Sequence, residues 1–224
     1  MRPLLRRWSP WLVFAGIVAF LLLDQLAVSL AVPSYDWHTD HVSSLAARGS
    51  SVWQIADAGL LAFAVAHLAA AEVVRTQWRA RWVSRLLQGS GVAFLGAAVF
   101  RTGCPVGEAH CGVDGAHNQL DDTLSALHGG LVSIYLVLML LAMVVAGFSS
   151  GRRRGPARWL LLASFPLAGL AWYSLGRFGA GPDFGLWERC WLMCNAVWLA
   201  ALTAGRGVDG HAPVTPVFPS SPVR

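Results

Sequence analysis

The chain has 224 residues, of which 55% are hydrophobic and 13% are charged, and its formal net charge is +5. This composition excludes an ordinary soluble globular domain, and the apolar runs leave no room for a separate soluble domain. The positive charge does not indicate nucleic-acid binding. The arginines cluster beside the ends of the apolar runs, where they would set membrane topology and meet anionic lipid head groups.

Six apolar runs follow one another, most of them close to the ~20 residues that a helix needs to cross a bilayer. We therefore expect membrane-spanning helices at about residues 11–31, 52–73, 83–100, 123–147, 159–175 and 184–204. The first run exceeds the ~7–15 apolar residues of a signal peptide and contains Asp24 and Gln25, so we expect it to be retained. Pro166 predicts a kink in the fifth run. Residues 1–205 form the predicted six-helix domain, and the Pro-rich residues 206–224 predict a disordered cytoplasmic tail.

Basic and acidic connections alternate along the chain. The arginine-rich segments contain Arg2, Arg6, Arg7, Arg75, Arg79, Arg81, Arg85, Arg152, Arg153, Arg154 and Arg158. The other connections carry Asp36, Asp40, Glu108, Asp114, Asp121, Asp122 and Asp183. The positive-inside rule then predicts an all-α bundle of six spans with both termini in the cytoplasm. Basic residues that are all Arg are typical of GC-rich bacterial genomes, so we expect a bacterial cytoplasmic membrane.

The second outer connection holds two cysteines, Cys104 and Cys111. On the oxidising side of the membrane, a disulfide that closes this small loop is the expected state. Two free thiols are the alternative, and they would follow from an inverted topology.

Four polar residues near the start of the fourth run are spaced four, four and three apart: His117, Asp121, Ser125 and His128. On a helix they share one face. Asp121, Ser125 and His128 could act as a nucleophile and base, and His117, Asp121 and His128 are weak candidates for metal ligands. The alternative is a capped helix whose single buried histidine bonds to a neighbour.

Charged residues also fall inside the apolar runs, at similar depths: Asp24, Asp57, Arg101 and Arg189. Charges in a bilayer are costly, by ~2.5–3.5 kcal/mol on insertion scales, so they normally face the bundle interior and pair. We expect the two acids to pair with the two arginines. The pairs either line a polar cavity or only hold helices together, and the sequence favours neither.

Histidines elsewhere carry weaker signals. His38, Asp40 and His41 in the first outer connection could bind a divalent cation, although a short polar loop collects such residues by chance. His67 is deeper and alone, which favours a satisfied packing residue.

Three stretches resemble the family of six-span prokaryotic membrane proteins called domain of unknown function 998. They are YDWHTDHVSSLAARGSSVWQIAD, FRTGCPVGEAHC followed by LSALHGG, and GLWERCW. The chain departs from the family at residues 100–103, where Phe-Arg-Thr-Gly stands in place of Phe-Pro and an acid. The resemblance implies the six-span fold and an outward-facing polar set, here His41, Ser44, Cys104, Cys111, His128 and Arg189. It implies no activity.

These observations predict a membrane-embedded binding or transport-related protein for a lipid-like or small amphipathic ligand. The predicted ligand-binding residues are Asp24, Asp57, Arg101, Arg189, His41 and Ser44. The alternatives are an intramembrane lipid hydrolase, with or without a metal, and a structural or accessory subunit, so enzymatic activity stays open. We expect no cofactor. The expected partners are membrane lipids, not nucleic acid, and a second copy or another membrane protein stays open.

Overall fold

The computed structural model describes residues 2–103, 123–149, 156–178 and 183–205, and every regular element in these ranges is helical. The elements are α1 (Arg2–Leu30), α2 (Val42–Leu45), α3 (Trp53–Val73), the π-helical turn η1 (Val74–Trp78), α4 (Arg81–Val99), α6 (Thr123–Phe148), α7 (Pro156–Leu162), α8 (Ser164–Phe178) and α9 (Phe184–Ala204). The all-helical fold class expected from the sequence is confirmed for this part of the chain.

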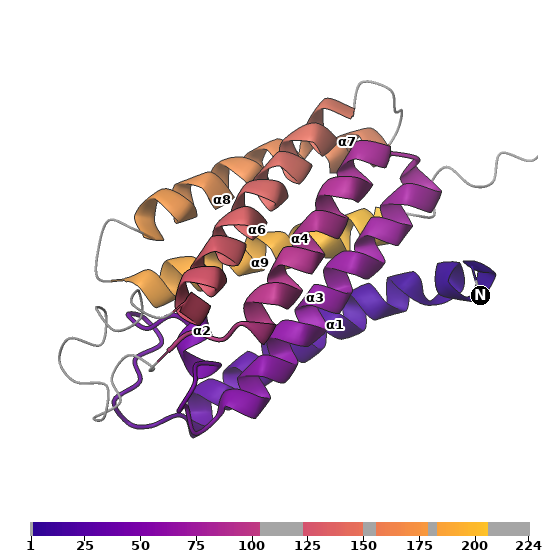
Figure 1. The fold of residues 1–224 in the computed structure, drawn as a ribbon. Coiled ribbons are helices and arrows are strands. Elements are labelled where there is room, and N and C mark those ends of the chain that lie inside the picture. Colours follow the sequence, from indigo (N-terminus) through magenta and orange to yellow (C-terminus); the bar gives the residue numbers. More distant parts are fainter. Residues whose placement is uncertain (1, 104–122, 150–155, 179–182, 206–224) are drawn as a thin grey trace, which may run out of the picture.

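The long helices form one closed bundle (Figure 1). α1 packs on α3, α3 on α4, α4 on α6, α6 on α8 and α8 on α9, and α9 returns to contact α1 and α3. Small residues allow the closest of these approaches. A Cβ at Gly16 on α1 would lie 2.9 Å from the Cβ of Ala66 on α3, so α1 and α3 pack in near backbone contact.

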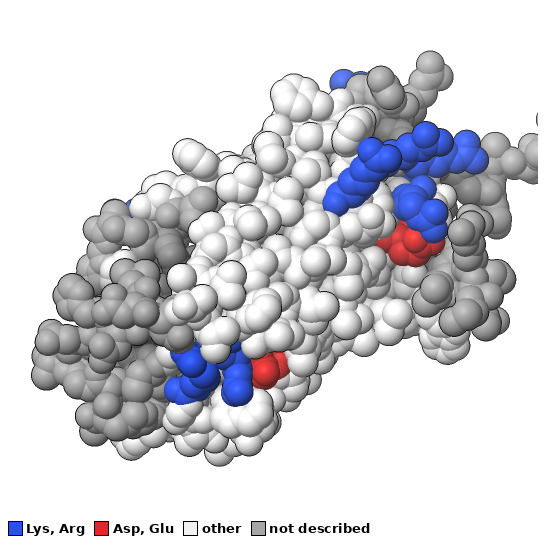
Figure 2. All heavy atoms as spheres, in the orientation of Figure 1, with Lys and Arg blue, Asp and Glu red and all other residues white. Residues whose placement is uncertain are grey.

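The bundle has two distinct ends. The start of α1, the turn between α3 and α4, and the end of α9 lie together, and we call this the arginine-rich end (Figure 1). Residues 31–52 and the start of α9 lie at the opposite end, which we call the loop end. In Figure 2 uncharged atoms cover the middle of the visible face, and the coloured charged residues gather toward the two ends.

Three helical stretches in the described part of the chain are long and apolar enough to cross a membrane: Trp8–Leu30, Trp53–Trp78 and Thr123–Phe148. Their length and apolar composition are those of a membrane protein. α4 and α9 are long enough, but Arg85, Glu188 and Arg189 are among the residues that lower their mean hydropathy. α8 has only 15 residues because the helix is interrupted before it.

That interruption lies at Ala163, between α7 and α8. Pro166 has no N–H to donate to the carbonyl of Leu162, which weakens the helix one turn before the proline. The chain stays close to helical across the break, since the N–H of Ala163 still donates to the carbonyl of Trp159 at 2.9 Å. Two further details were not expected: α1 begins well before residue 11, and the first connection contains the short helix α2. The tail at residues 206–224 lies outside the described residues.

Candidate functional site

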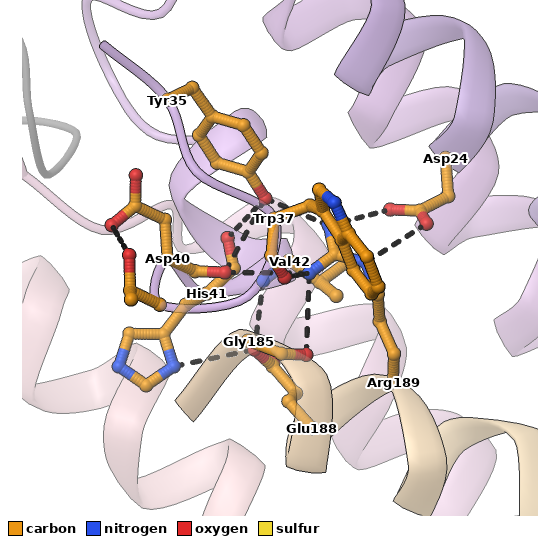
Figure 3. A network of polar contacts seen from close by, with 10 residues as sticks. Asp24, Tyr35, Trp37, Asp40, His41, Val42, Gly185, Glu188 and Arg189 are labelled. Carbon is orange, nitrogen blue, oxygen red and sulfur yellow. Dashed lines mark hydrogen bonds and ion pairs between the residues drawn. The ribbon is translucent and has the colours of Figure 1, made fainter. Parts of the chain in front are cut away.

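Arg189, on the second turn of α9, is the centre of a polar network at the loop end (Figure 3). Its Nε donates to a carboxylate oxygen of Asp24 on α1 at 3.3 Å, and its Nη2 donates to the hydroxyl of Tyr35 at 2.8 Å. Its Nη1 donates to the carbonyls of Trp37 at 3.0 Å and Gly185 at 3.3 Å. Nη2 also donates to the other carboxylate oxygen of Asp24 at 3.5 Å, so all five N–H donors of the guanidinium are occupied. Arg189 therefore ties α1, the first connection and α9 together and keeps no donor for a ligand.

The first connection lies directly on the start of α9. The N–H of Leu186 donates to the carbonyl of His38 at 3.0 Å, and Tyr35 donates to the carbonyl of His41 at 3.2 Å. Burial raises the pKa of the Tyr35 phenol well above its ordinary value of 10, despite the nearby charge of Arg189, so the hydroxyl stays a donor. Gly185 makes the contact possible, because a Cβ there would collide with the backbone of Asp40 and lie 2.6 Å from the carbonyl oxygen of Trp37.

Glu188 holds the same connection from the next position of α9. One of its carboxylate oxygens accepts the N–H of Val42 at 2.8 Å and faces Nδ1 of His41 at 3.3 Å. Burial alone would lower the pKa of His41, but the hydrogen bond and negative charge of Glu188, with the charge of Asp40, outweigh it and raise that pKa above 6.5. Ser44 is buried and its N–H donates to the carbonyl of His41 at 3.1 Å.

Asp57 and Arg101 do not repeat the pairing of Asp24 with Arg189. The guanidinium of Arg101 lies 4.0 Å from the ring centre of Trp53, and no ion pair joins it to Asp57 in the described part of the chain. The charge of Arg101 still acts on Asp57 at longer range. One carboxylate oxygen of Asp57 is buried and has no hydrogen-bond partner among the described residues.

A cavity of about 40 Å³ lies beside this network, lined by residues of α2, α3, α4, α6, α8 and α9. Its walls are mainly apolar, with Leu60, Phe94, Val132, Leu136 and Leu192 among them. The lining residues with polar side-chain groups are Ser43, His128, Tyr135, Ser174, Trp187, Glu188 and Trp191. A few polar groups in an apolar lining are typical of sites that hold small or amphipathic molecules.

The family model described as protein of unknown function (DUF998) matches residues 13–205. The chain belongs to the DUF998 family. The match covers the whole described bundle except the start of α1, so the network and the cavity lie within the family region. No curated protein and no solved structure matches this DUF998 protein.

His128 of this DUF998 protein lies in the cavity wall, but its Nδ1 already makes hydrogen bonds within the protein. Nδ1 lies 2.8 Å from the carbonyl oxygen of Ala97 and 3.1 Å from that of Phe100. Two carbonyl acceptors require Nδ1 to carry the proton, so His128 caps the end of α4 and Nε2 is left as an acceptor. The hydroxyl of Ser125 accepts the N–H of Gly103 at 2.8 Å. These contacts fit the alternative of a buried histidine bonded to a neighbour.

Several residues of the predicted site lie in parts of the chain that the structure does not describe. Cys104, Cys111, His117 and Asp121 lie outside the described residues, so the disulfide and the Asp121 contribution to a catalytic group stay predictions. In the first connection, the carboxylate of Asp40 accepts the N–H of Asp36 at 2.9 Å, and His41 faces Glu188. No group of three or more His, Cys, Asp or Glu side chains gathers as a metal site within the described ranges.

Two polar groups of the DUF998 cavity have no hydrogen-bond partner among the described residues. They are Nε1 of Trp191 and the hydroxyl of Ser174, and both residues are buried. Leaving such a donor unpaired costs about 1–3 kcal/mol, so each unpaired group requires an explanation.

The sequence analysis missed a buried chain of hydrogen bonds that includes Tyr135 of the cavity lining. Nδ1 of His67 donates to the carbonyl of Phe63 at 2.7 Å, which leaves Nε2 to accept from the hydroxyl of Tyr135 at 3.2 Å. Asn195 in turn donates to the Tyr135 oxygen at 3.2 Å. His67 is thus satisfied, as expected, but not alone. Tyr135, the only Tyr of the fourth apolar run, lies two turns beyond His128, and this helical spacing is the signal that could have revealed it.

Proposed function

We propose that this protein binds a lipid-like or other amphipathic ligand, whose polar end enters the cavity beside His128. The observation that carries the proposal is the pair of unpaired groups, Trp191 Nε1 and the Ser174 hydroxyl, in an otherwise apolar lining. A ligand oxygen placed between them would accept from the indole and exchange a hydrogen bond with the serine.

The charges beside the cavity favour an uncharged polar end. All donors of Arg189 are occupied, so it offers no positive charge to an anionic group. The carboxylate of Glu188 lines the cavity and would repel such a group. Nε2 of His128 supplies a further acceptor for a hydroxyl group. This role differs from the sequence prediction, in which Asp24 and Arg189 were ligand-binding residues.

The size of the cavity limits what enters it. The volume of about 40 Å³ is the space open to the centre of a water-sized sphere. One water molecule needs about 10–15 Å³ of such space, so the cavity holds a hydroxyl-sized group and a few atoms more. The ligand would therefore insert only its polar end. Its apolar remainder would stay in the lipid phase beside the bundle.

We further propose six membrane spans with both termini in the cytoplasm of a bacterial cell, so that the loop end faces outward. The arginines at the end where α1 starts and α9 ends support this orientation under the positive-inside rule. Single cysteines at exposed positions of each connection, labelled by a membrane-impermeant maleimide in whole cells, would test it. Labelling of residue 37 but not of residue 81 is expected, and the reverse pattern would contradict the orientation.

The binding proposal is tested on protein purified in mild detergent, by native mass spectrometry for retained lipid and elemental mass spectrometry for metal. Retained lipid without metal is expected, and Trp191→Phe should reduce the retained fraction by about tenfold, the effect of one lost hydrogen bond to a buried group. Trp172→Phe is the matched control, since Trp172 is exposed on α8.

Two other results would each contradict the proposal. Near-stoichiometric metal that is lost in His128→Ala would support the intramembrane hydrolase instead. Neither lipid nor metal would support an accessory subunit whose charges only join helices.

A further inference from the structure

A second cavity, of about 300 Å³, lies at the arginine-rich end, where η1, α4, α6, α7 and α9 meet. We propose that it binds the phosphate group of an anionic phospholipid. The site is separate from the cavity at the loop end, and it does not depend on the function proposed above.

The turn between α3 and α4 positions Arg79 at this cavity. η1 widens the last turn of α3, and Trp78 is anchored by a hydrogen bond of 3.0 Å from its indole to the carbonyl of Leu202 on α9. Arg79 follows with φ 53°, in the left-handed region that few residues other than glycine adopt. The hydroxyl of Ser84 donates to the carbonyl of Ala71 at 2.8 Å and fastens α4 to α3.

Arg79 differs from the other arginines near this turn. Arg75 forms an ion pair of 2.7 Å with Glu72, and the guanidinium of Arg85 lies over the ring of Trp82. Arg79 lines the cavity and has no ion-pair partner in the described part of the chain. Its planar guanidinium matches the geometry of a phosphate.

The rest of the lining suits the same ligand. Ala80 and Val83 bring the first turn of α4 to the cavity, and that helix start has no side-chain cap for its N–H groups. The hydroxyl of Ser149 donates to the carbonyl of Val145 at 2.9 Å, so Arg79 and the start of α4 supply the donors. No acidic residue occurs among the described lining residues. Leu161 and Leu202 belong to an apolar wall that would contact a glycerol backbone and acyl chains, so the lining favours a phospholipid over a free phosphate ion.

Native mass spectrometry of the full-length protein in detergent, titrated with phosphatidylglycerol or phosphatidylcholine, tests the proposal. We expect a preference for phosphatidylglycerol that Arg79→Gln reduces by about tenfold, the effect of losing one charge-assisted hydrogen bond. Arg81→Gln removes the same charge from the same turn. Both arginines are exposed, but only Arg79 lines the cavity. It should change the preference by less than about twofold.

Equal losses in the two variants would indicate general surface attraction and overturn the proposal, as would an unchanged preference in Arg79→Gln. Displacement of the lipid by inorganic phosphate at comparable concentration would identify a free-anion site and overturn the assignment to a phospholipid. If Arg79→Gln does not fold, Arg79→Gly replaces it. Glycine adopts the φ of this position without strain, so the same outcomes then decide.

Discussion

Ser164 and Ser174 lie on the same helix and are both fully buried, yet only Ser164 has a partner for its hydroxyl within the described chain. The Ser164 oxygen accepts the indole N–H of Trp198 at 2.8 Å. Ser174 faces the cavity that we propose as a ligand site. The two serines therefore contrast a structural hydrogen bond with an unpaired hydroxyl, which the ligand that we propose would bind.

This contrast predicts opposite effects of one chemical change. Ser164→Ala leaves the Trp198 N–H unpaired and should lower the free energy of unfolding by about 1–3 kcal/mol. Ser174→Ala removes a hydroxyl that has no partner, so it should leave stability unchanged or raise it by about 1 kcal/mol while weakening lipid retention. Thermal unfolding in detergent measures the first effect and native mass spectrometry the second. A destabilised Ser174→Ala protein would show that this hydroxyl has a structural partner.

The ion pair between Arg189 and Asp24 predicts a strong coupling of stability. The two side chains are exposed by only 14% and 8%, and removing one partner of a buried pair typically costs about 3–5 kcal/mol. Asp24→Asn and Arg189→Gln should each destabilise the bundle, and Arg189→Gln more, because it also releases the first connection. The double variant should lose less free energy of unfolding than the sum of the two single losses.

A double-mutant cycle by thermal unfolding checks this coupling. Asp57→Asn is the control, since Asp57 forms no direct ion pair in the described chain and should lose less than either single variant. Additive losses at Asp24 and Arg189 would show that the two residues act independently.

Gly185→Ala should loosen the packing of the first connection on α9 at the loop end. The added methyl group would collide with the backbone of the first connection, and overpacking of this kind costs about 1–3 kcal/mol or more. Gly169→Ala on α8 is the matched control, because nothing lies within 4 Å of its added Cβ and alanine favours a helix. Limited proteolysis should cut the first connection faster in Gly185→Ala than in Gly169→Ala. Equal cleavage would mean that the connection does not depend on this contact.

The pair of His41 and Glu188 predicts a pH dependence of stability. The pKa of His41 is raised in the folded protein, so its protonated form adds stability that is fully present below about pH 6.5 and is lost as the pH rises through the folded pKa. Asp40 adds to this effect and Arg189 opposes it. The melting temperature of the native protein should therefore exceed that of His41→Gln at low pH and converge with it at high pH. Parallel curves across this range would contradict the prediction.

Much of this architecture follows from apolar patterning. Runs of about 20 apolar residues indicate the long helices. An unpaired backbone group is costly in lipid, and a helix pairs its backbone groups within one segment, whereas a single strand leaves them unpaired. The placement of Asp24 opposite Arg189 was predictable as well, since both lie at similar depth and a buried charge needs a partner. Pro166 indicated the position of the break between α7 and α8 to within one turn.

The details of the site depend on contacts that no local pattern encodes. Arg101 has an aromatic ring as its neighbour, where the sequence suggested an acid, and His67 receives its partner from a helix 68 residues away. The role of Arg189 in holding backbone carbonyls depends on how residues 35–41 fold back over Gly185. These features require the three-dimensional path of a short polar connection, which composition and periodicity do not determine.

The separation of Asp24 from Arg189 has a consequence for synthesis of the protein. The two residues are 165 positions apart, so at ~5–20 residues per second the acid leaves the ribosome on the order of ten to thirty seconds before its partner exists. During this interval the first helix carries an uncompensated acidic group that lipid disfavours. We therefore expect the first helix to reach its final place in the bundle only when the last helix supplies Arg189.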